Sequence, residues 1–244
     1  MKRKIAIIFV TFIFLSLFAC QKNKNESYVK YDYFNLTLND QIKETTKPEI
    51  NNYAVDLINT DSINILINKN FKLLKDYVPK DLVVLDVKTI RDGMQLRKEA
   101  AEALNEMFAA ALLDNVSLMV GSAYRSYSKQ VSIYHNCLIS AGELEANRSC
   151  AIAGHSEHQT GLAVDLTNTA KACYLKQCFG ETAAGIWLKE NAYKYGFILR
   201  YTTENEGITG YKNEPWHYRY IGIMEAEKVY NSGLCLEEFY GIVK

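Results

Sequence analysis

Two short segments of this chain hold residues whose types and spacing are suited to chemistry. The first contains His158 seven residues before Asp165, in the stretch GHSEHQTGLAVDL. The second contains Glu214 three residues before His217, in the stretch EPWHYRY. Two imidazoles, one carboxylate ligand and one spare carboxylate are the inventory of a hydrolytic zinc site with an open position for water. From the residues alone, the alternative is that these side chains are structural polar groups with satisfied hydrogen bonds.

The local sequence predicts how each pair is presented. Apolar residues alternate over 162–166, which predicts a strand with Asp165 on the face opposite to them. Pro215 argues against a helix interior, so the second segment does not match the helical His-Glu-x-x-His arrangement. In a regular strand Glu214 and His217 would point to opposite faces. We therefore expect the Glu-Pro step to bend the chain and bring the two side chains together.

The other candidates are weaker. His155 is a less suitable alternative to His158 as a ligand, because it fits a loop position near the pocket rim better. His135 falls in the middle of a predicted helix and is expected at the surface or in packing. The aromatic run at 216–220 is expected to be core on the far side of its strand rather than a platform for stacking sugars.

Hydrophobic periodicity predicts the elements that must position these residues. Apolar residues from Leu96 to Ala111 follow the spacing of one helical face. A second helix should begin near Ser126, have an apolar side that includes Val131, and stop at Gly142. The predicted elements are a strand at 63–67, a helix at 95–113, a strand at 116–120, helices at 126–141 and 182–195, and a strand at 197–201. This order favours an α+β fold, with a small, mainly antiparallel sheet flanked by helices, over a parallel doubly wound fold.

Length and composition limit the size and class of the protein. A chain of 244 residues with 48% apolar residues supports one sizeable core rather than two ordinary domains. We therefore expect a single catalytic domain, and a monomer. With 28 basic and 28 acidic residues, the charge balance does not point to nucleic acid as a partner.

The N-terminus predicts export. Basic residues 2–4 precede an apolar run at 5–18, which is the layout of a secretory signal peptide and is short for a membrane-spanning helix. The run ends in Leu-Phe-Ala followed by Cys20, which resembles the lipobox of bacterial lipoproteins. The expected organisation is a lipoprotein signal peptide at 1–19, a lipidated Cys, tether and N-terminal arm at 20–62, and a catalytic domain at 63–244. The protein would then be extracytoplasmic and lipid-anchored to the cell membrane; a plain membrane anchor or soluble secretion is the alternative.

Five further cysteines leave their pairing open. They are Cys137, Cys150, Cys173, Cys178 and Cys235. Export permits disulfides, and Cys137 with Cys150 and Cys173 with Cys178 are candidate pairs. The alternative is that all five are ordinary small buried residues. The chain has no Cys-x-x-Cys pair, so a thiolate zinc site is not expected.

The order of the motifs resembles a known family. The spacing Ser156-x-His158-x-x-Gly161-x-x-x-Asp165, followed by Glu214-x-x-His217, is similar to the paired motif of the VanY-type D-alanyl-D-alanine carboxypeptidases. That family is related to the D,D-dipeptidases and L,D-carboxypeptidases of the cell wall and to the fold of the hedgehog signalling domain. The resemblance extends to the segments at 124–126, 195–201 and 208–211, and it covers about residues 63–240.

The resemblance implies a role for each matched residue. His158, Asp165 and His217 would bind Zn²⁺, and Glu214 would act as general base and then general acid. Arg125 matches the arginine that contacts the substrate carbonyl or its developing oxyanion.

The resemblance also points to the substrate pocket. Ser156 and Gln130 match positions that line the pocket for the terminal residue, and Tyr211 is expected to line the substrate cleft. The chain departs from the family pattern at Ala153, where Pro is common, and this change could loosen the loop that delivers His158.

The activity implied is removal of the C-terminal D-alanine from peptidoglycan stem peptides, with the membrane reached through the N-terminal lipid. Two alternatives remain open. One is an L,D-carboxypeptidase acting on tetrapeptide stems. The other is a non-catalytic, zinc-stabilised module that binds the wall. Glu214 is present together with all three ligands, which favours catalysis.

Overall fold

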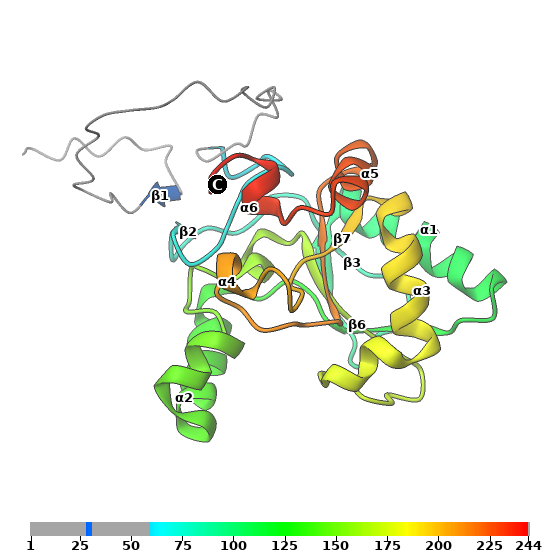
Figure 1. Cartoon of the computed structure of the whole chain (residues 1–244), viewed down its shortest axis with the longest axis horizontal. Helices are drawn as coiled ribbons and strands as arrows, with labels where there is room; N and C mark the ends of the chain where they lie inside the picture. Colours follow the sequence, from blue (N-terminus) through cyan, green and yellow to red (C-terminus); the bar gives the residue numbers. More distant parts are fainter. Residues whose placement is uncertain (1–27, 31–58, 244) are drawn as a thin grey trace, which may run out of the picture.

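A computed structural model describes residues 28–30 and 59–243, and its centre is a four-stranded sheet (Figure 1). The strands lie in the order β5 (Leu118–Ser122), β6 (Ala163–Asn168), β8 (His217–Tyr220) and β7 (Phe197–Leu199). Each neighbouring pair is antiparallel. The predicted α+β class with a small antiparallel sheet is therefore confirmed.

Two-stranded ribbons and helices surround this sheet. The ribbons pair β1 (Tyr28–Lys30) with β2 (Phe71–Leu73), and β3 (Leu82–Val84) with β4 (Gln95–Arg97). The α-helices are α1 (Lys98–Leu113), α2 (Tyr127–Ser149), α3 (Ala183–Asn191), α4 (Glu206–Thr209), α5 (Ile223–Ser232) and α6 (Leu236–Phe239). Short 3₁₀ helices are η1 (Glu157–Thr160), η2 (Gln177–Glu181) and η3 (Ala192–Tyr195). Helices α1, α3 and α5 lie on one side of the sheet, and α2 projects on the other (Figure 1).

The apolar face of the first predicted helix is buried as expected. Ala100, Leu104, Met107 and Ala111 are fully buried on α1 and face the core. The helix begins at Lys98 rather than at 95, because residues 95–97 pair with β3 instead.

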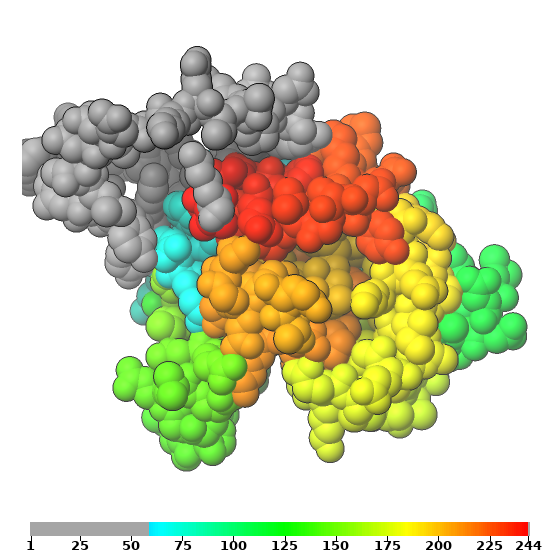
Figure 2. All heavy atoms as spheres, viewed as in Figure 1, coloured from blue at the N-terminus to red at the C-terminus, as the bar shows by residue number. Residues whose placement is uncertain are grey.

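Helix α2 differs from its prediction in length and in its buried face. The Ser126 side chain accepts a hydrogen bond from the Lys129 amide, so the predicted start is correct. Gly142, with φ +74°, ends the first helical run as predicted, but a second helical run that was not predicted follows it up to Ser149. Val131 is exposed, because α2 stands away from the body of the protein (Figure 2, green). Only Gln130 and Ala146 of α2 are buried, among the described residues.

The strand predicted at 63–67 is also wrong. Ile65 and its two successors are buried, yet Ile65 takes part in only an isolated β-bridge and the segment forms no strand. The carbonyl oxygens of Ile63 and Ile65 accept hydrogen bonds from the Arg219 guanidinium. Because a side chain satisfies these backbone groups, burial here does not require a neighbouring strand.

The later elements follow the prediction closely. The Thr182 side chain accepts a hydrogen bond from the Gly185 amide and caps α3. The predicted helix changes to 3₁₀ at Ala192 and ends before Gly196, whose φ of +83° suits glycine.

Several N-terminal predictions lie outside the described residues. They include the signal peptide, Cys20, and the tether and arm up to residue 58 except for residues 28–30, which form β1. Within the part of the chain that the structure describes, no helix is both long enough and apolar enough to cross a membrane.

Candidate metal centre and substrate cavity

Three side chains converge at one end of the central sheet. One donor atom from each of His158, Asp165 and His217 lies within 4.8 Å of the others, and all three residues are buried. Asp165 on β6 is directly opposite His217 on β8 in the antiparallel register, so strand pairing brings them together. His158 lies on η1, immediately before β6. Asp165 Oδ1 is 3.3 Å from His158 Nε2 and 3.2 Å from His217 Nδ1.

The two imidazoles present different nitrogens to this point. His158 Nδ1 is 2.7 Å from the carbonyl oxygen of Ala123, which can only accept, so Nδ1 carries the proton. The lone pair of His158 Nε2 then faces the cluster, where this buried atom has no hydrogen-bond partner among the described residues. A buried acceptor without a partner is costly unless a ligand completes it. The residues therefore fit a zinc ion with two nitrogen ligands and one oxygen ligand.

Burial and neighbouring charges determine the protonation states of His158 and Asp165. Burial lowers the pKa of His158 to about 4, which keeps its imidazole neutral. Burial by itself would raise the pKa of Asp165, but His158, His217 and Arg125 outweigh it and hold that pKa well below its usual range. A neutral imidazole and an ionised carboxylate are the forms that bind a metal.

Glu214 lies beside this cluster because the chain turns. The His217 amide donates to the Glu214 carbonyl oxygen over 2.9 Å, which closes a turn around Pro215. Glu214 Oε2 is then 3.8 Å from His217 Nδ1, so the two side chains share one side, as the predicted bend requires. Burial raises the pKa of Glu214 to about 7. A carboxyl group with such a pKa can take up and release a proton near neutral pH.

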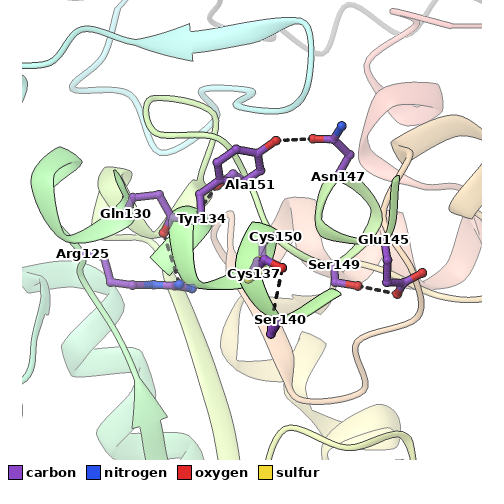
Figure 3. Close-up of a disulfide and its surroundings, with 10 residues drawn as sticks. All are labelled: Arg125, Gln130, Tyr134, Cys137, Ser140, Glu145, Asn147, Ser149, Cys150 and Ala151. Atoms are coloured by element: carbon purple, nitrogen blue, oxygen red, sulfur yellow. Dashed lines mark hydrogen bonds between the residues drawn. A yellow bond between two sulfur atoms is a disulfide. The ribbon is translucent and has the colours of Figure 1, made fainter. Parts of the chain in front are cut away.

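Arg125 approaches the same point from the start of α2. Its guanidinium Nη2 is 3.6 Å from Asp165 Oδ2, and Nη1 donates to Gln130 Oε1 over 3.2 Å. Gln130 in turn donates from Nε2 to the Ala151 carbonyl oxygen over 2.7 Å (Figure 3). Arg125 Nε is buried without a hydrogen-bond partner among the described residues. The guanidinium is thus positioned by Gln130 and retains a donor for another group.

Two adjoining hollows open at the cluster. A small cavity of about 60 Å³ is lined by the predicted pocket residues Gln130, Ser156 and Tyr211, together with His158, His217 and Glu214. A wider cleft of about 600 Å³ shares Arg125 and Glu214 with it. The cleft also includes Cys137, Cys150, Leu175, Lys176, Gln177 and Trp216.

One disulfide lines the wider cleft, and a second closes the loop whose residues 175–177 also line it. Cys137 and Cys150 are paired, and so are Cys173 and Cys178, which are the two candidate pairs from the sequence. The first bridge joins Cys137 in α2 to Cys150, the residue that follows α2 (Figure 3). The break at Gly142 lies between them in the chain. Among the described cysteines, Cys235 is unpaired and buried.

The weaker candidates lie outside the metal cluster, but one of them, Trp216, lines the wider cleft. His155 is outside the metal cluster, and its Nδ1 is 2.8 Å from the Asn68 carbonyl oxygen. His135 is exposed on α2. Tyr218 and Tyr220 are buried in the core, as expected, whereas Trp216 is only partly buried and lines the cleft.

Glu157 and Tyr201 were not singled out by the sequence. Glu157 is buried, and its Oε2 is 3.1 Å from His217 Nε2. The Tyr201 ring centre is 4.9 Å from that of His217. The one available signal was that Glu157 is a charged residue directly before the candidate ligand His158.

A family model and related sequences match this chain. Residues 93–223 match the VanY model, described as D-alanyl-D-alanine carboxypeptidase. A putative carboxypeptidase of Bacillus subtilis, YodJ, is 44% identical over 190 residues, which span 76% of this chain and 70% of YodJ. A D-alanyl-D-alanine carboxypeptidase of Enterococcus faecalis is 36% identical over 174 residues, which span 66% of this chain and 61% of that protein.

Solved structures show the same fold. The LD-carboxypeptidase LdcB superposes with a TM-score of 0.70 at 43% identity, covering 76% of this chain and 88% of LdcB. VanYB in complex with D-alanine-D-alanine superposes with a TM-score of 0.61 at 34% identity, covering 75% of this chain and 99% of VanYB. A mutant of the D,D-pentapeptidase VanY in complex with Zn(II) superposes with a TM-score of 0.58 at 34% identity, covering 73% of this chain and 98% of the mutant chain.

Proposed function

The chain belongs to the VanY family of D-alanyl-D-alanine carboxypeptidases, and from this premise we propose that it is a zinc-dependent D,D-carboxypeptidase of peptidoglycan stem peptides. One observation carries the proposal. The donor atoms of His158, Asp165 and His217 converge at a cavity where Glu214 is also present. This is the donor set and spare carboxylate that metal-assisted hydrolysis of a peptide needs.

The three ligands would hold zinc through His158 Nε2, an Asp165 carboxylate oxygen and His217 Nδ1. A zinc ion there supplies Lewis acidity to the scissile carbonyl and to the attacking water. Support for zinc comes from the VanY mutant structure that contains Zn(II) and from the buried His158 Nε2, which has no hydrogen-bond partner in the described part of the chain.

Glu214 is the proposed general base and acid. It takes a proton from the attacking water and then delivers it to the leaving amine. Its pKa of about 7 suits both steps, because the group is neither fully ionised nor fully protonated near neutral pH. Arg125 is the proposed partner of the negative charge that develops on the carbonyl oxygen. Two observations support that role: Nε has no hydrogen-bond partner within residues 59–243, and Gln130 holds the guanidinium in place.

The two hollows suggest how the peptide is accommodated. The cavity of about 60 Å³ has room for a small terminal residue such as alanine, with Ser156, Gln130 and Tyr211 as its lining. The cleft of about 600 Å³ would take the rest of the stem peptide. Because Arg125 and Glu214 line both, the scissile bond would lie between the two hollows.

An L,D-carboxypeptidase is the second candidate function. The observation that favours it is the match to LdcB, whose TM-score of 0.70 exceeds that of VanYB at 0.61. An L,D-carboxypeptidase DacB of Streptococcus pneumonia is also similar, at 35% identity and a TM-score of 0.59. The two activities differ in the configuration of the residue before the scissile bond, which occupies the cleft.

Defined stem peptides distinguish these functions. The zinc-loaded protein would be incubated with a pentapeptide ending in D-Ala-D-Ala and with a tetrapeptide ending in a single D-Ala, and products identified by mass spectrometry. We expect loss of one alanine from the pentapeptide. Cleavage of the tetrapeptide alone would instead establish the L,D activity.

The matched control is Glu214→Gln, which keeps size and polarity but removes the base. It should retain zinc and peptide binding and lose about 100-fold or more in turnover. Equal cleavage by this variant would show that Glu214 is not the base. Binding of both peptides without cleavage by the unaltered protein would favour the non-catalytic wall-binding module.

We also propose that Cys20 carries lipid and anchors the protein outside the cytoplasmic membrane. The apolar run that ends at Cys20 supports this, and so do two disulfides, which are typical of oxidising compartments. Labelling cells with a fatty-acid analogue should mark the protein, and Cys20→Ala should abolish the label. Cys235→Ala is the control and should leave it unchanged. Label that persists without Cys20 would refute lipidation at this site.

A further inference from the structure

Glu157 is a buried carboxylate that contacts a proposed metal ligand from behind. Its side chain is fully buried. Oε2 lies 3.1 Å from His217 Nε2, on the side of the ring away from Asp165. Oε1 accepts hydrogen bonds from Arg200 Nε over 2.8 Å and from Arg219 Nη1 over 3.1 Å. Both carboxylate oxygens are therefore occupied by these contacts, although Glu157 is also one of the residues that line the cavity of about 60 Å³.

The surrounding charges keep Glu157 ionised. Arg200 and Arg219 form buried ion pairs with it, at 2.8 and 3.1 Å from Oε1, and two guanidinium groups at these distances favour the carboxylate form. An ionised carboxylate can only accept hydrogen bonds. The proton between Glu157 and His217 therefore belongs to Nε2, and the lone pair of a neutral His217 ring is left on Nδ1, which faces Asp165.

The two arginines are themselves fixed. Arg200 donates two hydrogen bonds to the carboxylate of Glu237 on α6, over 2.9 and 2.6 Å. Arg219 donates to the backbone carbonyl oxygens of residues 63 and 65. Glu157, Arg200, Arg219 and Glu237, here called the Glu157 network, are each at most 2% exposed. Two carboxylates and two guanidinium groups balance in charge, and a buried network of this kind is rigid when every partner is satisfied.

We propose that Glu157 is a positioning residue that fixes the tautomer and ring orientation of His217 for metal binding. The inference rests on the proposed zinc site, but not on which peptide is cleaved. A carboxylate behind a histidine ligand raises the basicity of the ligand nitrogen and holds the ring, and its loss typically weakens metal affinity by about 10- to 100-fold. His158 needs no such carboxylate, because the Ala123 carbonyl oxygen accepts the hydrogen bond from its Nδ1 and fixes that ring.

A matched pair of variants tests this role. Glu157→Gln and Glu237→Gln each remove a buried carboxylate that bonds to Arg200, so both should lower stability. Of these two glutamates, Glu157 hydrogen-bonds to His217, whereas Glu237 hydrogen-bonds to Arg200 and Asn68. Zinc affinity, measured by competition with a chelator, should fall about 10- to 100-fold in Glu157→Gln and stay unchanged in Glu237→Gln. The visible absorption of the cobalt-substituted protein should change only in Glu157→Gln.

Equal losses in the two variants, or no loss in either, would overturn the proposal. If Glu157→Gln does not fold, nitrogen-15 NMR of the unaltered zinc-loaded protein gives a second test. It should show a proton on His217 Nε2 and on His158 Nδ1, and an unprotonated His217 Nε2 would overturn the proposal. Zinc binding with the expected tautomers but without peptide cleavage would instead refute the proposed activity and leave the role of Glu157 intact.

Discussion

Removing the disulfide between Cys137 and Cys150 should lower the free energy of unfolding by about 3 kcal/mol. The two cysteines are 13 residues apart, and closing a loop of this length restricts the unfolded chain by about that amount. Cys173 and Cys178 are only 5 residues apart, so the same reasoning gives about 2 kcal/mol for their removal. For a domain of this size, 1 kcal/mol corresponds to roughly 2–4 °C in Tm.

The larger bridge also has a local consequence. Cys150 directly precedes Ala151, whose carbonyl oxygen accepts the hydrogen bond from Gln130 that helps to position Arg125. Without the bridge to Cys137, the second half of α2 is joined to the first by the break at Gly142 and by the hydrogen bond from the Tyr134 hydroxyl to Asn147 Oδ1. We therefore expect turnover to fall in this variant at temperatures where the protein is still folded.

Double serine variants of each pair provide the assay. Thermal and urea unfolding would be compared at one fixed zinc concentration, because bound metal adds to stability. Cys137→Ser with Cys150→Ser should reduce Tm by roughly 6–12 °C, and Cys173→Ser with Cys178→Ser by roughly 4–8 °C. An unchanged Tm after loss of the larger bridge, or a greater loss from the smaller one, would refute the argument from loop length.

Three further predictions concern the metal centre. Arg125→Lys should keep zinc but lose about 100-fold or more in turnover, because lysine retains the charge without the planar fork; near-normal kinetics would make Arg125 structural. Alanine variants of His158, Asp165 and His217 should each lose stoichiometric zinc in metal analysis, whereas His155→Ala should retain it, since His155 is outside the cluster. Burial lowers the pKa of His217, but hydrogen bonds to Asp165 and a neighbouring glutamate outweigh it and raise that pKa to about 9. Zinc must displace this proton, so apparent zinc affinity should rise about tenfold per pH unit between pH 6 and 8; a flat profile would contradict this.

Local patterns in the sequence predicted the elements where side-chain periodicity and burial agree. The apolar face of α1 is buried at Leu104 and Met107, and Ser126 caps α2 as its position indicated. The same reasoning failed for Val131 on α2 and for the segment at 63–67. In both cases the outcome depended on what lies next to the segment in space, and periodicity carries no information about that.

The sequence by itself determined the donor types and their spacing, because the alternation around Asp165 and the turn between Glu214 and His217 are local. The tertiary structure decided what surrounds those donors. Glu157 is 60 residues from His217, and their contact follows from the pairing of β6 with β8 and from the placement of η1 before β6. The contact between Arg219 and the Ile65 carbonyl spans 154 residues. Contacts over such separations leave no periodic signal in one chain, because they arise only when the core brings distant segments together.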